Sequence, residues 1–136
     1  DEIGSLFPNT FAHQVSASTN AANGYVIEID GTTLTNQYGD TIEAIGGTKE
    51  VPAAGTEQFG LRAEVNTGNG SVSAPYDDAI FQYAYDTANM PDNVFTGPGD
   101  DIVTDYDVSY LGSIDSATPA GEYTATITYT MHAVFN

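Results

Sequence analysis

Apolar and polar side chains alternate from Tyr123 toward the end of the chain. One face carries Tyr123, Ala125, Ile127, Tyr129, Met131, Ala133 and Phe135, and the other carries Thr124, Thr126, Thr128, Thr130 and His132. A period of two is the pattern of a half-buried β-strand. Because strands usually run for about 5 or 6 residues, the length of this pattern allows three alternatives: a strand central in its sheet, a bent strand shared by two sheets, or a strand that pairs with a neighbouring molecule.

Short strand-like segments separated by turn residues make up the rest of the chain. The pattern predicts strands over residues 11–17, 25–30, 40–45, 58–65, 79–86 and 102–113. Asp30-Gly31 is predicted to form a hairpin turn, and residues 49–57 and 87–101 are predicted loops. Residues 79–86 are apolar on both faces, which is typical of a central strand. No segment has the periodicity of an amphipathic helix.

The regular spacing of these segments predicts an all-β fold. Short strands with Gly, Pro, Asn and Asp between them favour an antiparallel β-sandwich, Ig-like or jelly-roll-like, with about 7 to 10 strands. A chain of 136 residues can bury about two-thirds of its unfolded surface without help from a metal or a disulfide. The sequence has no internal repeat and no linker, so residues 1–136 are predicted to form one domain.

The charge balance restricts the possible partners. The chain has 19 acidic residues against two basic ones, Lys49 and Arg62, and a net charge of −17. Such a surface repels nucleic-acid phosphates and anionic lipid headgroups, which excludes these partners. The hydrophobic content of 40% is too high for a disordered chain. We therefore expect a folded protein at the cell surface or outside the cell, in salty or calcium-containing surroundings.

Other features of the sequence restrict the possible chemistry and the organisation of the chain. The chain has no Cys, which excludes disulfides, thiol nucleophiles and thiolate metal sites. No apolar run is long enough to span a membrane or to act as a signal sequence. The chain begins with Asp1 rather than Met, so we expect a mature chain from which a leader was removed.

An aspartate-rich segment lies between residues 77 and 107. The predicted metal ligands are Asp77, Asp78, Asp86, Asp92, Asp100, Asp101, Asp105 and Asp107. Ca²⁺ takes about six to eight oxygen ligands, and Gly-rich turns allow several to converge. The segment therefore predicts a calcium site. Because EF-hand spacing is missing, the alternative is a solvated acidic face.

The sequence indicates no catalytic site. His13 and His132 are the only imidazoles, and neither has a second metal ligand at i+2 or i+4. No nucleophile-elbow sequence is present, and carboxylate pairs are expected by chance among so many acids. We therefore expect that the protein is not an enzyme.

Aromatic residues and one sequon suggest contacts with carbohydrate. Exposed rings could stack on sugars, but six of them alternate along predicted strands, which favours core packing: Tyr25, Phe59, Phe81, Tyr83, Tyr123 and Tyr129. Asn69-Gly70-Ser71 is an N-glycosylation sequon in a predicted loop. A glycan at Asn69 is therefore expected if the host makes them.

Three segments resemble those of secreted bacterial Ig-like surface proteins. They are TNAANGYVIEIDGTTLT, AGTEQFGL and TPAGEYTATITYT. The last is similar to the final hairpin of spore-coat-U-type pilins and of WxL-type surface domains. The resemblance implies an Ig-like sandwich displayed outside the cell, and the pilins polymerise when one subunit lends a strand to the next. The chain departs from these families because it has no Cys and no Trp.

The function predicted from these observations is structural. We expect a subunit of an extracellular filament or surface lattice, assembled from copies of the chain by strand exchange or β-augmentation and stabilised by Ca²⁺. The predicted subunit contacts are Ile3, Leu6, Phe7, Phe11, Tyr129, Met131, Ala133 and Phe135, so either terminus can donate the strand. The alternative is a monomeric adhesin or carbohydrate-binding module that contacts a host surface or glycan.

Overall fold

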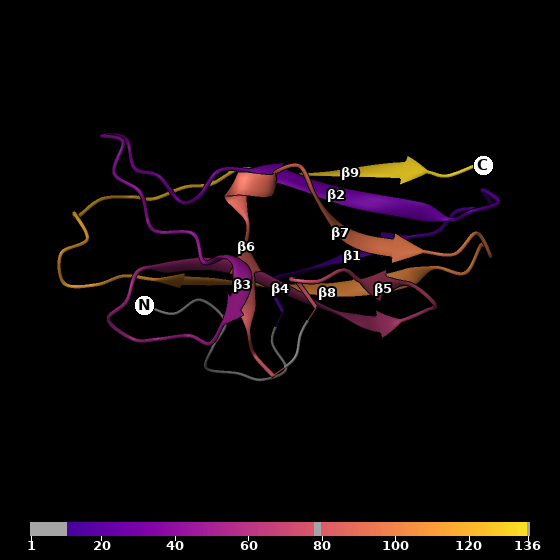
Figure 1. Ribbon diagram of the computed structural model, residues 1–136, viewed down its shortest axis with the longest axis horizontal. Helices are drawn as coiled ribbons and strands as arrows, with labels where there is room; N and C mark the ends of the chain where they lie inside the picture. The colour runs from indigo at the N-terminus through magenta and orange to yellow at the C-terminus, as the bar shows by residue number, and fades with distance from the viewer. Residues whose placement is uncertain (1–10, 78–79, 136) are drawn as a thin grey trace.

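The computed structural model describes residues 11–77 and 80–135 and contains two antiparallel β-sheets (Figure 1). The first sheet has the order β1 (His13–Ala17), β8 (Thr104–Ser113), β4 (Gln58–Thr67), β6 (Tyr83–Tyr85) and β3 (Gly46–Glu50). The second has the order β5 (Ser71–Val72), β7 (Asp92–Gly97), β2 (Tyr25–Gly31) and β9 (Ile127–Ala133). A 3₁₀ turn, η1, covers Thr87–Asn89. The predicted all-β sandwich is confirmed, and the strand number in the described residues lies within the predicted range.

The strongest pairing within the first sheet joins β4 and β8. It extends from Gln58 opposite Ser113 to Thr67 opposite Asp105, with a bulge after Val65. The first six residues of β4 are all buried, because one face packs on the second sheet and the other is covered by surrounding segments. This pair fixes the position of β1, which pairs with the other side of β8.

Aromatic residues from both sheets meet in the core. Phe95 of β7 stacks on Tyr106 of β8 with 4.0 Å between ring centroids. The hydroxyl of Tyr106 donates to the carbonyl oxygen of Thr96 and lies 2.7 Å from the hydroxyl of Tyr25. Buried tyrosines need hydrogen-bond partners for their hydroxyls. These contacts therefore hold the sheets together without leaving the hydroxyls of Tyr25 and Tyr106 unsatisfied.

The alternating segments are predicted well, and the predicted hairpin at Asp30-Gly31 is wrong. Residues 11–17, 25–30, 58–65 and 102–113 correspond to β1, β2, β4 and β8. Gly31 is the last residue of β2, which pairs with β7 and β9. A side chain at Gly31 would meet the oxygen of Thr126 at 2.6 Å and the hydroxyl of Tyr85 at 2.7 Å. Glycine is needed there for close packing and not for a turn.

Three other segments differ from the prediction. Residues 40–45 form only isolated bridges, and Gly46-Gly47, directly after the predicted strand, begin β3. The predicted loop 87–101 contains β7, whose Val94 and Phe95 are fully buried. The strand expected over residues 79–86 is reduced to β6, because Ile80 and Phe81 have φ values of 88° and 53°. Phe81 is 38% exposed and is not a core residue.

Replacing Phe95 by alanine tests the core. Removal of a buried Phe ring costs about 3 to 5 kcal/mol, so we expect Phe95→Ala to lower the free energy of unfolding by that amount in urea denaturation. Tyr38→Ala is the matched control, because Tyr38 is 76% exposed and its loss should change stability by no more than about 0.5 kcal/mol. Equal losses in the two variants would contradict this core.

Candidate functional site

The edge strands β1 and β9 lie on the same side of the sandwich, which we call the open side. In the described part of the chain, β1 has only β8 beside it and β9 has only β2. The ring of His13 in β1 lies 5.7 Å from that of Tyr129 in β9, edge to face. Figure 1 shows β9 along the rim of the sandwich. Each strand therefore presents unpaired backbone groups here, as an edge strand does.

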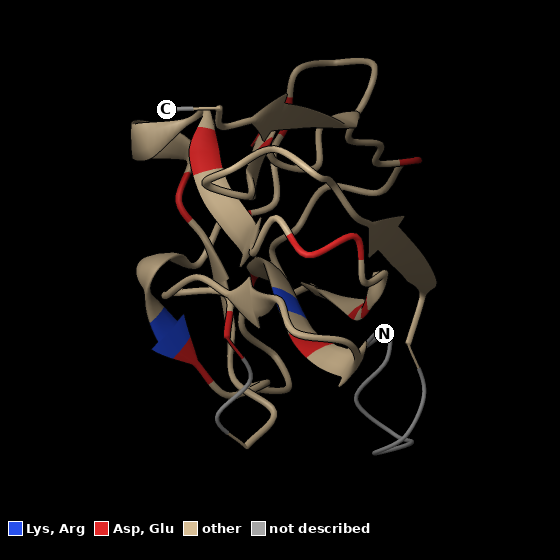
Figure 2. Cartoon of the chain, turned by 90° about the vertical axis from the view of Figure 1, so that its right-hand side faces the viewer, with Lys and Arg blue, Asp and Glu red and all other residues tan. Residues whose placement is uncertain are grey.

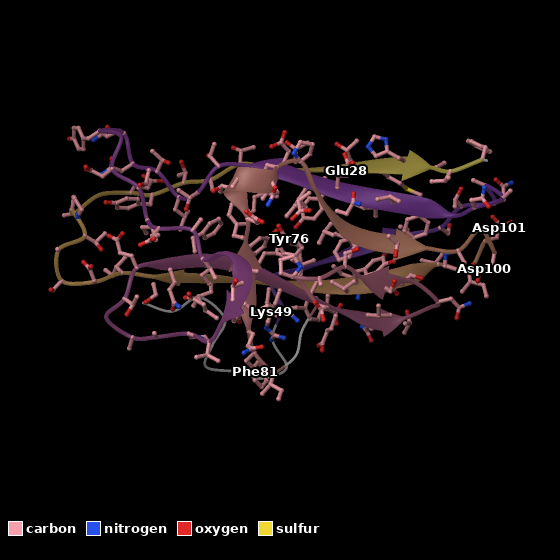
Figure 3. The ribbon with its side chains drawn as sticks, viewed as in Figure 1. Glu28, Lys49, Tyr76, Phe81, Asp100 and Asp101 are labelled. Atoms are coloured by element: carbon pink, nitrogen blue, oxygen red, sulfur yellow. The ribbon has the colours of Figure 1, made fainter. Side chains whose placement is uncertain are left out.

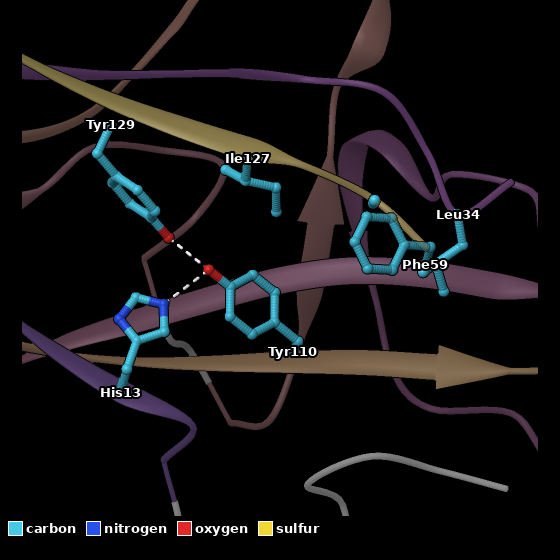
Figure 4. A pocket seen from close by; sticks show the side chains of 7 residues that line it. His13, Leu34, Phe59, Tyr110, Ile127 and Tyr129 are labelled. Carbon is cyan, nitrogen blue, oxygen red and sulfur yellow. Dashed lines mark hydrogen bonds between the residues drawn. The ribbon is translucent and has the colours of Figure 1, made fainter. Parts of the chain in front are cut away.

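A cavity of ≈ 350 Å³ lies between the sheets at the open side (Figure 4). Its lining is mostly apolar and comes from distant parts of the sequence: His13, Leu34, Phe59, Tyr110, Ala125, Ile127 and Tyr129. An apolar cavity of about 150 Å³ is large enough to hold benzene. This cavity therefore has room for a large apolar side chain.

Three polar rings form a hydrogen-bonded chain at the cavity. His13 Nε2 lies 2.8 Å from the hydroxyl oxygen of Tyr110, which lies 2.6 Å from that of Tyr129 (Figure 4). The chain joins β1, β8 and β9. Burial raises the pKa of Tyr110 and that of Tyr129, and the proximity of the two hydroxyls raises the latter further. Both phenols therefore remain protonated at neutral pH.

Apolar residues at the end of the chain are left uncovered. Ile127 and Tyr129 are partly buried over the cavity, whereas Ala133 on the same alternating face is exposed. Met131 is 43% exposed and Phe135 is 65% exposed. The apolar face predicted from the sequence therefore exists, but only its first half is covered by the described residues.

Alternation of hydrogen bonds shows which backbone groups of β9 are free. Thr124 exchanges hydrogen bonds with Thr35 before the strand, and Val134 bonds to Asn23 and Gly24 after it. The register between β9 and β2 has no shift. In an antiparallel pair, alternate residues point their N–H and C=O toward the partner. The even-numbered residues of β9 therefore bond to β2, and the odd-numbered residues point theirs to the free edge.

The edge strands β1 and β9 carry no Asp, Glu, Lys or Arg, and each contains one histidine, His13 and His132. β1 and residues 123–135 contain no Asp, Glu, Lys or Arg, although the net charge is −17. Figure 2 shows acidic positions distributed over several other loops and strands, with the two basic positions in strands. Another copy of the chain would meet no Asp, Glu, Lys or Arg on these two strands themselves, although Glu28 of the adjacent β2 lies 3.1 Å from His132 Nε2.

The predicted contact residues divide into two groups. Tyr129, Met131 and Ala133 lie in β9, with Phe135 just beyond it. Phe11 precedes β1 and is 44% exposed, whereas Ile3, Leu6 and Phe7 lie outside the described residues. Within the described residues β9 lies at the edge of one sheet, which contradicts the alternatives of a central strand and of a strand shared by two sheets.

Several of the predicted calcium ligands have separate protein partners. Asp77 pairs with Lys49 at 2.9 Å. Side-chain hydrogen bonds join Asp86 to Asn89, Asp92 to Tyr76, Asp100 to Asn69, Asp105 to Ser16 and Thr67, and Asp107 to Gln14. Figure 3 shows Asp100 and Asp101 at one end of the sandwich and Lys49 near its middle. The predicted ligands are therefore not gathered at one place.

No group of three or more His, Cys, Asp or Glu side chains within residues 11–77 and 80–135 could hold a metal ion. Asp78 lies outside these ranges. The calcium site therefore stays a prediction from the sequence.

The sequon residue Asn69 is exposed in the turn between β4 and β5. Its side-chain amide donates a 2.8 Å hydrogen bond to Asp100. This bond and another from the N–H of Ile102 hold the pKa of Asp100 below its usual value. A glycan at Asn69 would replace one N–H of this amide and stays a prediction.

Sequence reasoning missed most of the cavity. Leu34 comes from the irregular segment after β2, and Tyr110 from β8, so no local pattern connects them. His13 was expected to be a strand residue without a special role, yet it lines the cavity. Its place in the alternating pattern with Val15 and Ala17 was the one available signal that its side chain faces inward.

Comparisons with protein-family models, with curated proteins and with solved structures gave no match. The resemblance to spore-coat-U-type pilins and WxL-type domains therefore remains a prediction from three short segments. A search of the described residues for membrane-spanning helices found none of sufficient length and hydrophobicity.

Alkaline titration tests the burial of Tyr85, Tyr110 and Tyr129. Burial raises the pKa of Tyr85 to about 12 and raises those of Tyr110 and Tyr129. The folded state therefore favours the neutral phenols, so stability should be constant up to about pH 10, the ordinary tyrosine pKa, and fall above it. Urea denaturation as a function of pH measures this fall.

Tyr129→Phe provides the comparison for that titration. Removing one such phenol should make the fall shallower by up to about 1.4 kcal/mol per pH unit. Tyr38→Phe is the control, because Tyr38 is exposed. Identical slopes for wild type and Tyr129→Phe would show that Tyr129 is not buried.

Proposed function

We propose that the protein is a structural subunit of an extracellular filament or surface lattice, in which copies associate by exchanging or adding β-strands. The open side carries this proposal. There, two uncharged edge strands flank an apolar cavity, and Met131 and Phe135 expose their side chains. A strand from another copy would supply main-chain hydrogen bonds to the free edge and side chains to the cavity.

Either end of the chain can supply such a strand. The C-terminal candidates are Tyr129, Met131, Ala133 and Phe135, and the N-terminal candidates are Ile3, Leu6, Phe7 and Phe11. If a segment of one subunit binds a different surface on the next, the contact does not close on itself and produces a fibre.

Assembly must overcome electrostatic repulsion between subunits. Each subunit has a net charge of −17, and surface charges are screened over about 8 to 10 Å near physiological salt. Salt, or Ca²⁺ shared by acidic side chains of adjacent subunits, would reduce this repulsion. This requirement supports an extracellular location and a role for Ca²⁺ between subunits.

Exposure of the aromatic residues weighs against the alternative, a monomeric adhesin or carbohydrate-binding module. All nine tyrosines lie in the described residues, and Tyr38 alone is exposed. Within the described residues the other exposed rings are Phe11, Phe81 and Phe135, which come from three different segments of the chain. A sugar-binding surface built on stacked rings needs several of them at one place. We therefore favour a non-enzymatic structural subunit over the binding module.

Electron microscopy tests the assembly. We expect filaments or sheets with millimolar Ca²⁺, and we expect them to loosen after chelation because repulsion between the acidic subunits returns. Size-exclusion chromatography should place the assembled material in the void volume. Polymers that do not change after chelation would contradict the role of Ca²⁺. Monomers under both conditions would contradict the structural proposal and favour the glycan-binding alternative.

Met131→Glu tests the open side. The substitution places a carboxylate on the uncovered apolar face of β9, so we expect a folded protein with at least about a tenfold loss of assembly, equivalent to about 1.4 kcal/mol. Thr126→Glu adds the same charge at an exposed residue of the opposite face and should assemble nearly as wild type. Circular dichroism checks folding, and light scattering measures assembly. Normal assembly of Met131→Glu would place the contact elsewhere.

A further inference from the structure

We propose that β9 pairs with β9 of a second copy, antiparallel and with its two-fold axis at Thr130. This inference rests on the proposed function and identifies one subunit contact of the assembly, at the open side. Because a two-fold contact closes on itself, growth of a filament or lattice then requires a second contact elsewhere on the subunit. Pairing would join the two four-stranded sheets into one continuous sheet across the dimer. The same strand edge serves both copies, as a two-fold contact requires.

The free backbone groups limit the possible registers. The odd-numbered residues of β9 direct their N–H and C=O to the free edge, as the bonds of Thr124 and Val134 indicate. Hydrogen-bonded pairs across the dimer must therefore join odd-numbered residues. The two-fold axis must then pass through a residue and not between two residues. Thr130 is the central residue of β9, so an axis there pairs the strand over its full length.

This register matches exposed residues of one copy with cavity residues of the other. Met131 lies opposite the partner's Tyr129, Ala133 lies opposite the partner's Ile127, and an extension of the pairing places Phe135 opposite the partner's Ala125. In each copy, the uncovered residues are Met131, Ala133 and Phe135. They face Tyr129, Ile127 and Ala125 of the other copy, which line the cavity of that copy. Each copy would thus cover the cavity side that its partner leaves open.

Phe135 then contributes a side chain to the partner's site. Its ring is 65% exposed, and the cavity of ≈ 350 Å³ exceeds the roughly 150 Å³ that suffices for an aromatic ring. The hydrogen-bonded rings of His13, Tyr110 and Tyr129 remain paired among themselves. The contact therefore needs only apolar packing and main-chain hydrogen bonds.

The outer face and the charge of the strand are compatible with this pairing. Residues 123–135 carry no Asp, Glu, Lys or Arg, so the paired strands bring no carboxylate of their own to the centre of the dimer. Glu28 lies opposite Thr130 on the β2 side, where its carboxylate pairs with His132 at 3.1 Å. The exposed hydroxyls of two Thr130 residues would lie side by side in a non-hydrogen-bonded pair, where Cα atoms are about 4.5 Å apart. Threonine pairs in this arrangement are favourable.

Single cysteines provide the test, because the chain has no other Cys. We expect the full-length Thr130→Cys variant to form a disulfide-linked dimer on mild oxidation, since a spacing of about 4.5 Å lies within the range for disulfides. Thr128→Cys is the matched control. Its two copies would be offset by four residues, about 13 Å along the strand, so we expect cross-linking to be at least about ten times slower.

The cross-linked dimer is measured on non-reducing gels, and electron microscopy of the wild type is carried out in parallel. Fast cross-linking of Thr130→Cys alone supports the register. Equal rates for the two variants, or faster cross-linking of Thr128→Cys, overturn it. If the wild type forms polymers but Thr130→Cys does not cross-link, this inference is wrong and the proposed function stands. If the wild type is a monomer, the inference and the proposed function are both wrong.

Discussion

Hydrogen bonding of the backbone at the sheet edges is the constraint on which the arrangement of this protein depends. A β-strand carries donors and acceptors on both sides, and β9 has partners on one side in the described residues, where it pairs with β2 without a register shift. Because that pairing fixes the strand, it also fixes which backbone groups face outward and which side chains face the cavity. An exposed edge of this kind favours association, and Met131 adds apolar surface to it.

Tyrosine side chains connect the two sheets in the interior of this sandwich. Its ring fills the core, and its hydroxyl reaches across the gap to another polar atom. Tyr25 and Tyr106 make such a contact deep in the core, and Tyr110 and Tyr129 make one at the open side. The second pair is accompanied by His13, so the polar contact continues to the strand at the edge.

Alternation of apolar and polar residues in the sequence was sufficient to locate four of the strands. It identified β1, β2, β4 and β8, and it placed the buried face of the last strand correctly from Tyr123 to Tyr129. It failed at β7, whose buried Val94 and Phe95 stand between Pro91 and Pro98 in a segment that has the composition of a loop. A period of two also indicates only which face of a strand is buried. It does not state what lies beside a strand, so the edge position of β9 required the structure. The cavity could not be predicted either, because Leu34, Phe59 and Tyr110 meet only after folding.

The positions of the two basic residues have a consequence for resistance to proteolysis. Proteases of the trypsin type cut after lysine or arginine, and this chain offers them two positions. Arg62 is 3% exposed within β4, where its guanidinium carbon lies 4.8 Å from the ring centre of Phe81. Lys49 lies in β3 and is held by Asp77. Cleavage requires accessible, locally unfolded backbone, so the folded chain is a poor substrate for these enzymes at both positions.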